Sequence, residues 1–522
     1  MQAQNNSKDW LWRPSLIVFF SNACVMTIEL VADRIIAPFV GVSLYTWTSV
    51  IGVILAGMSV GNFIGGKLAD RYASKRLLGG MFIVAGIGSL LVLLMVGAFG
   101  GGGFTVTSGL PLPLRMVLFV AFIFFVPSAL LGTISPLVVK LTLVNLNQTG
   151  NVIGRIYAAS ALGSILGTFA TGYFLISWAG TSAIMLGVGI ALVIIGLLFI
   201  EAPRNRFAPA IGSAVLVVAI VSISLVTHGA LTRGQCLRET DYYCIRVTDK
   251  VLVDKSTLKV LSLDHLVHSA SSLDDPLRLF YPYLKATAEL TEYVAQRNNA
   301  PMRMLFIGGG GYTFPRYVEK VYPQSVIDVI EVDPGVTAVA YEQLGLKPDT
   351  IVKTYNEDAR TMIKAMPASQ RYDIVYGDAF NDFTVPYHLV TLEFNQMVLS
   401  HMTDDGIYVL NLIDGKSLPF VSAFMRTLRQ IFHYTYLIPA DTQWESQSRE
   451  TYVVVASNIP IDTARLRLMT GGDKERSIDE WLLPESRVEA LLKDGSQFIL
   501  TDDYVPVDNL LAPIYSVSGN VQ

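Results

Sequence analysis

A run of four glycines and several acidic residues in the C-terminal half could together bind a nucleotide. The glycines end an apolar segment and two acids follow about twenty residues later, the separation typical of dinucleotide-binding folds. These residues are Gly308, Gly309, Gly310, Gly311, Glu331 and Asp333. Glycine allows a tight turn and a close approach of the backbone to a ligand, and the acid can accept both ribose hydroxyls. The pattern predicts a nucleotide or nucleoside site and does not separate NAD from S-adenosylmethionine (SAM).

Acidic residues also follow the next two apolar segments. Asp358, with Ala359 beside it, is placed to accept a hydrogen bond from an adenine amino group. Asp378 and Asp382 stand in "YGDAFND", where a carboxylate within hydrogen-bond reach could deprotonate and hold an amine. Each aspartate could instead cap the helix that follows it. We assign none of these residues to a metal.

Alternating strands and helices must position these residues. After Pro301 we expect strands at 302–308, 326–333, 351–358, 372–378, 406–413 and 451–457, with helices between most of them. This alternation predicts a mainly parallel sheet covered by helices, a Rossmann-like α/β fold, whose ligands bind at the carboxyl ends of the strands. A small β region should precede it, with short strands at 242–250, 251–255, 258–264 and 265–270 and then a helical stretch.

The N-terminal half has the composition of a membrane protein. The chain of 522 residues is 52% hydrophobic and 16% charged, whereas soluble proteins carry charge on about a quarter of their residues. A bilayer span needs about 20 apolar residues. We expect an α-helical bundle of seven spans, at 15–37, 46–68, 77–99, 115–139, 153–177, 180–200 and 208–228.

The loop charges orient these spans. Basic residues gather in "KLADRYASKR" and "PRNR" and at Lys140 and Arg155, and the intervening loops carry no charge. The positive-inside rule makes the basic loops and the N-terminus cytoplasmic. Seven spans would put the C-terminal half outside the cytoplasm, and one span fewer would reverse this. Cys236 and Cys244 could form a disulfide, which would agree with an oxidising location, or remain two thiols.

Two features of the membrane half bear on its function. "GGKLADRYASKR" resembles the basic loop between the second and third helices of major-facilitator transporters. In the first span, Glu29 and Asp33 lie four residues apart and therefore on one helix face. Ionisable groups in a span usually face partners or a cavity. These two could attract a cation such as a polyamine, or they could pair with Arg34 or Arg155.

The C-terminal segments, in this order, resemble the spermidine synthase (polyamine aminopropyltransferase) family. The resemblance covers residues from about 240 to 460 and rests on "LDHLVHS", the Tyr281 region, the glycine run, "EVD", "EDA" and "YDIVYGDAFND". In that family the glycine loop and the acid matching Glu331 hold a SAM-type nucleoside. The residue matching Asp358 binds adenine, and the acid matching Asp378 activates the attacking amine. His268 resembles a glutamine that touches the same ligand, and Tyr281 resembles a tyrosine of the substrate gate. The whole chain looks like the branch of the family that is fused to a membrane domain.

The glycine loop departs from the family pattern. The family loop is Gly-Gly-Gly-Asp-Gly-Gly, and here it is "GGGGYT". Gly311 stands in place of the aspartate that grips the amine of decarboxylated SAM, and Tyr312 and Thr313 replace the next glycines. An aspartate would repel the carboxylate of intact SAM, so its absence removes one electrostatic barrier to that donor. Asp382 lies one residue further along than the second acid of the family's active loop.

We therefore expect an enzyme that cleaves the bond between sulfur and the aminoalkyl chain of SAM or decarboxylated SAM and releases methylthioadenosine. The nucleophile would be an amine of a polyamine, or a group of the SAM tail itself, giving a cyclised or eliminated product. Two other classes stay open: a transporter with a ligand-sensing synthase-like domain, and a SAM-dependent methyltransferase.

The expected organisation is a transmembrane domain at 1–228, a small β region with a gate helix at 229–300, and a catalytic domain at 301–522. The protein would be a multi-pass protein of the cell (inner) membrane. Its partners would be the bilayer, the nucleoside co-substrate and a polyamine, with a homodimer as one allowed assembly. We expect no permanently bound cofactor, and the net charge of −4 gives no argument for nucleic-acid binding.

Overall fold

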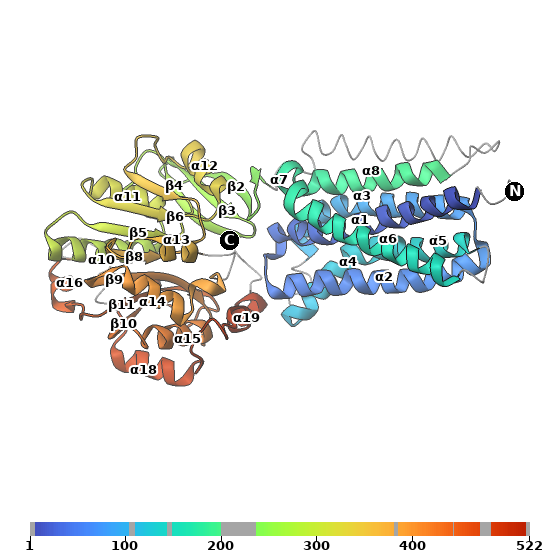
Figure 1. The fold of residues 1–522 in the computed structure, drawn as a ribbon. Coiled ribbons are helices and arrows are strands. Elements are labelled where there is room, and N and C mark those ends of the chain that lie inside the picture. The colour runs from blue at the N-terminus through green and yellow to red at the C-terminus, as the bar shows by residue number, and fades with distance from the viewer. Residues whose placement is uncertain are drawn as a thin grey trace. The chain divides into compact units, whose positions relative to one another are not determined.

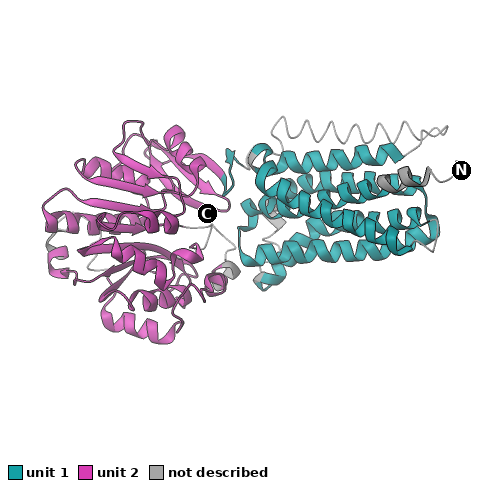
Figure 2. Ribbon diagram, viewed as in Figure 1, with its two compact units in different colours: residues 1–244 teal, residues 245–522 magenta. Residues whose placement is uncertain are grey.

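The chain forms two compact units, residues 1–244 and residues 245–522 (Figure 2). The computed structural model describes residues 6–103, 110–143, 149–199, 236–379, 385–441, 443–469 and 482–517. In the described residues the first unit is mainly helical, and the second is built around β-sheets (Figure 1). The predicted division into three domains stays a prediction.

Within the described residues, the first unit contains six helical segments that are long and apolar enough to cross a membrane. They are Pro14–Val40, Leu44–Tyr72, Lys75–Phe99, Pro113–Thr142, Thr149–Leu175 and Thr181–Phe199. Six of the predicted spans are thereby confirmed, with small shifts at their ends. The seventh, predicted at 208–228, lies outside the described residues.

These spans pack closely in pairs (Figure 1). The elements are α1 (Asn6–Val40), α2 (Leu44–Tyr72), α3 (Lys75–Gly103), α4 (Leu112–Gly132), α5 (Ile134–Thr142), α6 (Thr149–Ala170), the π-helix η3 (Thr171–Leu175), α7 (Ile176–Ala179) and α8 (Thr181–Phe199). The closest pairs are α1 with α6, α2 with α4, and α3 with α8. A Cβ on Gly61 of α2 would lie 2.0 Å from the carbonyl oxygen of Ala129 in α4. Small residues therefore let the backbones touch, as is typical of helices packed in a membrane.

The two carboxylates of α1 differ in exposure. Asp33 is buried, with 4% of its surface exposed, and Glu29 is half-buried. A Cβ on Gly163 of α6 would lie 2.1 Å from the carbonyl oxygen of Phe19 in α1. Gly163 and Phe19 therefore lie side by side, and this contact gives the register of the two helices. With a rise of 1.5 Å per residue, this register puts Arg155 about 30 Å from Asp33 along the pair. The structure therefore excludes Arg155 as the partner of Asp33.

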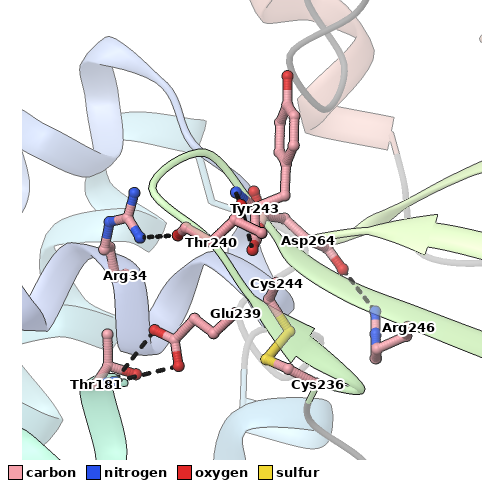
Figure 3. The surroundings of a disulfide bond; sticks show 9 residues. All are labelled: Arg34, Thr181, Cys236, Glu239, Thr240, Tyr243, Cys244, Arg246 and Asp264. Carbon is pink, nitrogen blue, oxygen red and sulfur yellow. Dashed lines mark hydrogen bonds between the residues drawn. A yellow bond between two sulfur atoms is a disulfide. The ribbon is translucent and has the colours of Figure 1, made fainter. Parts of the chain in front are cut away.

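A disulfide joins Cys236 and Cys244 and closes a loop (Figure 3), which confirms the bonded alternative. Arg34 of α1 donates hydrogen bonds to two backbone carbonyl oxygens of this loop. The amide of Thr181, the first residue of α8, donates to both carboxylate oxygens of Glu239 at 3.2 and 3.1 Å. The loop is thus bonded to α1 and α8, at the ends of these helices that lie away from the basic loop of residues 67–76.

A small sheet begins within the disulfide loop. Its strand order is β1 (Arg238–Glu239), β2 (Cys244–Val251), β3 (Thr257–Leu263) and β4 (Leu266–Ser272). Strands β2, β3 and β4 are antiparallel neighbours. The strand predicted at 251–255 is wrong, because Leu252 donates to the carbonyl oxygen of Ser256 at 2.9 Å across a turn. Lys255 has a positive φ of 67° in this turn.

The large sheet has seven strands in the order β10–β11–β9–β8–β5–β6–β7. They are β5 (Arg303–Ile307), β6 (Val326–Ile330), β7 (Val352–Tyr355), β8 (Tyr372–Gly377), β9 (Met402–Asp414), β10 (Tyr434–Pro439) and β11 (Glu450–Ser457). Strands β5 to β9 pair in parallel, and β11 and β10 add antiparallel strands at one edge. Strands β5 and β6 are largely buried, which explains their near-continuous apolar sequence. The predicted Rossmann-like fold is confirmed, and β10 is a strand that the sequence analysis missed.

The helices of the second unit connect these strands. They are α10 (Pro282–Asn298), α11 (Thr313–Val321), α12 (Pro334–Gln343), α13 (Ala359–Ala365), the 3-10 helix η4 (Tyr387–Leu389), α14 (Leu392–Ser400), α15 (Pro419–Leu428), α16 (Thr463–Met469), α18 (Glu485–Asp494) and α19 (Val507–Val517).

Candidate active site

A cavity of about 380 Å³ lies at the carboxyl ends of β5, β8 and β9. These three strands are neighbours in the sheet, so their ends meet at one edge, where α/β sheets bind ligands. Strand β4 and the start of α10 form a second wall, and residues between β10 and the start of β11 form a third.

The predicted site residues fall into two groups. Those that line the cavity are His268, Tyr281, Gly308, Gly309, Gly310, Gly311 and Asp378. Those at the ends of β6 and β7, which are not part of its lining, are Glu331, Asp333, Asp358 and Ala359. Asp382 lies outside the described residues.

The glycine loop has a conformation that requires glycine. Gly308 has a φ of 98°, and a Cβ there would lie 2.3 Å from the carbonyl oxygen of Asp378. Glu331, at the end of β6, accepts hydrogen bonds from the amides of Gly309 and Gly310 at 2.9 and 3.1 Å and of Asp333 at 3.0 Å. Burial raises the pKa of Glu331, and these amides oppose that effect. Since a carboxylate offers about four acceptor positions, one remains for a ligand hydroxyl.

The two other acids of this region cap helices. Asp333 accepts from the amide of Gly335 at 2.7 Å at the start of α12. Asp358 accepts from the amide of Thr361 at 2.9 Å at the start of α13 and pairs with the imidazole of His388 at 2.7 Å. Burial raises the pKa of Asp358, but the Thr361 amide and His388 outweigh it and hold this pKa below its usual value. Both residues therefore act as helix caps. The contact between Asp358 and adenine stays a prediction.

Asp378 lies at the end of β8 and is held by two side chains. Asn411 of β9 donates to its Oδ1 at 2.7 Å, and the Tyr283 hydroxyl donates to its Oδ2 at 3.3 Å. Burial raises the pKa of Asp378, and these hydrogen bonds lower it. The ring of Tyr283 stacks on that of Tyr281, with the ring centroids 6.0 Å apart. The sequence analysis missed Tyr283 and Asn411, although an asparagine inside the apolar segment "YVLNLI" was a usable signal.

Three polar atoms around this cavity are buried and have no hydrogen-bond partner within the described residues. They are Nε2 of His268, Oγ of Ser269 and Oδ1 of Asn411. Buried polar groups are nearly always partnered in folded proteins, so their convergence on one cavity indicates a ligand site. Burial lowers the pKa of His268 to about 4, so its imidazole is neutral at pH 7.

The residues that replace the family's last loop glycines anchor the loop. Tyr312 is completely buried, and its hydroxyl hydrogen-bonds with those of Thr337 and Thr354 at 3.1 Å each. Thr313 hydrogen-bonds with Ser271 of β4 at 2.5 Å. These contacts tie the glycine loop to the large sheet on one side and to the small sheet on the other.

Comparisons with known proteins agree with this architecture. The sequence model of the Major Facilitator Superfamily matches residues 14–309, more than half of the chain. The chain belongs to the Major Facilitator Superfamily. The six spans found in the described residues equal the number in one half of such a transporter.

Three curated relatives are similar to this chain in sequence. A polyamine aminopropyltransferase of Vibrio vulnificus (strain CMCP6) is 31% identical over 168 residues, which are 32% of this chain and 54% of that protein, about half its length. A probable polyamine aminopropyl transferase of Bifidobacterium longum (strain NCC 2705) is 28% identical, covering 60% of this chain and 70% of that protein. The polyamine aminopropyltransferase of Corynebacterium efficiens (strain DSM 44549 / YS-314 / AJ 12310 / JCM 11189 / NBRC 100395) is 24% identical, covering 80% of each chain. The chain is therefore similar to polyamine aminopropyltransferases, and it also contains a membrane domain.

Proposed function

We propose that the protein is a membrane-integrated transferase that binds SAM or decarboxylated SAM and cleaves the bond between its sulfur and its aminoalkyl chain. The observation that carries this proposal is the convergence of Asp378 with unpartnered polar atoms of His268, Ser269 and Asn411 on one cavity beside the glycine loop. The relatives named above are aminopropyltransferases, which supports the same class of reaction.

The proposed chemistry needs little from the protein beyond orientation and a base. A nucleophile attacks the aminoalkyl carbon bonded to the sulfonium, the bond between that carbon and sulfur breaks, and its electron pair neutralises the sulfur to give methylthioadenosine. When the nucleophile is an amine, it must lose one proton, and Asp378 accepts it. Tyr283 and Asn411 hold Asp378 in place for this step. When the nucleophile is a group of the SAM tail, the product is cyclised. Elimination needs no nucleophile: a base such as Asp378 removes a proton from the carbon next to the one bonded to sulfur, a double bond forms in the tail, and methylthioadenosine leaves.

The test is release of methylthioadenosine. Purified full-length protein is incubated with SAM or with decarboxylated SAM, each with and without a polyamine. We expect release in at least one mixture, and its loss in Asp378→Asn. Asp373→Asn is the matched control, because Asp373 lies at the opposite end of the same strand, where it bonds to Asn298 and Arg303. Release of S-adenosylhomocysteine instead would identify a methyltransferase, and no product in any mixture would contradict the enzyme.

The disulfide loop supports an orientation. Its anchors on α1 and α8 lie at the membrane face opposite to the basic loop of residues 67–76, which the positive-inside rule places in the cytoplasm. A disulfide is also typical of an oxidising compartment. We therefore place the loop and the start of β2 outside the cytoplasm. The seventh span predicted at 208–228, which lies outside the described residues, would agree with this orientation.

Membership of the Major Facilitator Superfamily favours a second candidate, a transporter whose synthase-like unit senses ligand. Uptake of a labelled polyamine into vesicles tests it. Transport that persists unchanged in Asp378→Asn would support the transporter, and the absence of any protein-dependent transport would contradict it.

A further inference from the structure

The space beside Gly311 is filled by Ser269. A Cβ added to Gly311 would lie 1.9 Å from Oγ of Ser269 and 2.7 Å from its Cβ. Gly311 does not have a positive φ, so Ser269, rather than the backbone, excludes a side chain here. Where the spermidine synthase family has an acid that grips an amine, this site presents a neutral, buried and unpartnered hydroxyl.

The third wall of the same cavity carries charges of both signs. Arg449, Glu450 and Asp441 all line it. Asp441 accepts from the amide of Gln443 at 2.8 Å, and Glu450 accepts from the amide of Thr451 at 2.7 Å. The hydrogen bond from Thr451 leaves further acceptor positions on the carboxylate of Glu450. The wall therefore offers a guanidinium together with two carboxylates.

The positive charge of Arg449 acts on His265, in the turn that leads into β4. Burial lowers the pKa of His265 to about 4, and the positive charges of Arg246 and Arg449 add to this effect. His265 lies just before β4, the strand that brings His268 and Ser269 to the cavity. Arg449 is thus electrostatically close to the strand that supplies the second wall.

We propose that this cavity takes the α-amino-acid tail of intact SAM, with the tail carboxylate on Arg449 and the tail ammonium on Asp441 or Glu450. This proposal rests on the proposed function. A guanidinium binds a carboxylate through two parallel hydrogen bonds. The tail of decarboxylated SAM and the chain of a polyamine carry ammonium groups and no carboxylate for Arg449. A zwitterionic tail matches all three side chains, and the neutral pair of Gly311 and Ser269 does not repel it.

Binding measurements with three ligands test the proposal. The affinities of the full-length protein for methylthioadenosine, SAM and decarboxylated SAM are measured by calorimetry. The wild type should bind SAM at least about tenfold more tightly than decarboxylated SAM, and Arg449→Gln should weaken SAM binding about tenfold. Methylthioadenosine lacks the tail, so its affinity should not change. Arg303→Gln is the matched control, because Arg303 lies at the opposite end of β5.

A second variant makes room for the missing acid. Ser269→Gly combined with Gly311→Asp should shift the preference toward decarboxylated SAM by at least about tenfold relative to Ser269→Gly alone. Equal binding of SAM and decarboxylated SAM by the wild type, with no effect of Arg449→Gln, would overturn this inference and leave the proposed function standing. Failure of the wild type to bind any of the three ligands would overturn both.

Discussion

Replacement of Asn411 by leucine should raise the pKa of Asp378. The two side chains have similar size, so the main change is the loss of the 2.7 Å hydrogen bond to Oδ1 of Asp378. The carboxylate would then keep only the 3.3 Å hydrogen bond from Tyr283. Because burial already raises this pKa, the loss of a donor to the charged form acts in the same direction.

The size of the shift follows from the strength of the lost bond. A hydrogen bond to a charged group contributes about 1.5–3 kcal/mol, and one pKa unit corresponds to about 1.4 kcal/mol. The pKa of Asp378 should therefore rise by about 1 to 2 units. Tyr283→Phe removes the longer bond and should raise the pKa by less than about 1 unit.

The pH dependence of methylthioadenosine release measures this shift. A catalytic base works only as a carboxylate, so activity falls as the pH drops through its pKa. The acidic limb of the profile should move to higher pH by the amounts above, whatever the change in the rate at high pH. Asn298→Leu is the matched control, because it breaks an Asn–Asp hydrogen bond of 3.2 Å to Asp373, away from the cavity. An unmoved limb in Asn411→Leu, or one moved to lower pH, would refute this account of the base.

Three further changes test the fold around the site and the membrane helices. The new Cβ of Gly308→Ala would lie 2.3 Å from a backbone oxygen, so this variant should lose methylthioadenosine binding. The new Cβ of Gly310→Ala would meet nothing within 4 Å, so this variant should lose only about 1 kcal/mol of stability in thermal unfolding, because of its positive φ. Equal losses of binding and stability in the two variants would contradict the loop geometry. Gly61→Leu should lower the unfolding temperature in detergent, because the new side chain would separate α2 from α4. Gly52→Leu should not, because a side chain there meets open space. A lower unfolding temperature for Gly52→Leu than for Gly61→Leu would contradict the packing. Without reductant, a maleimide should label one thiol of the denatured protein, Cys24, rather than all three cysteines. Because the disulfide restricts the unfolded chain, Cys236→Ser should lower the free energy of unfolding by about 2–3 kcal/mol.

The sequence predicted the features that depend on local pattern. The spans follow from length and apolar content, and the strand ends at Gly308 and Asp378 follow from apolar runs that stop at glycine or acid. It could not predict contacts made by packing, such as Tyr283 and Asn411, which meet Asp378 only because α10 and β9 both lie beside the end of β8. The error at 251–255 has a similar cause, because Val253 is apolar yet fully exposed in a turn.

The proposed orientation bears on which donor the site can receive. SAM is made in the cytosol, and a site outside the cytoplasm needs a donor that has crossed the membrane. Against a potential that is negative inside, export of each positive charge costs about 2.3 kcal/mol per 100 mV. Intact SAM carries one net positive charge and decarboxylated SAM carries two, so at 100 mV the outward gradient favours SAM by about 2.3 kcal/mol, or roughly 50-fold in concentration. If the proposed orientation and the proposed tail site both hold, transport energetics and the Arg449 wall of the cavity favour the same donor for independent reasons. In a unit that faces the cytoplasm, only the Arg449 wall would favour SAM, because the donor would not have to cross the membrane. The side of the membrane and the donor preference should therefore be measured on the same preparation.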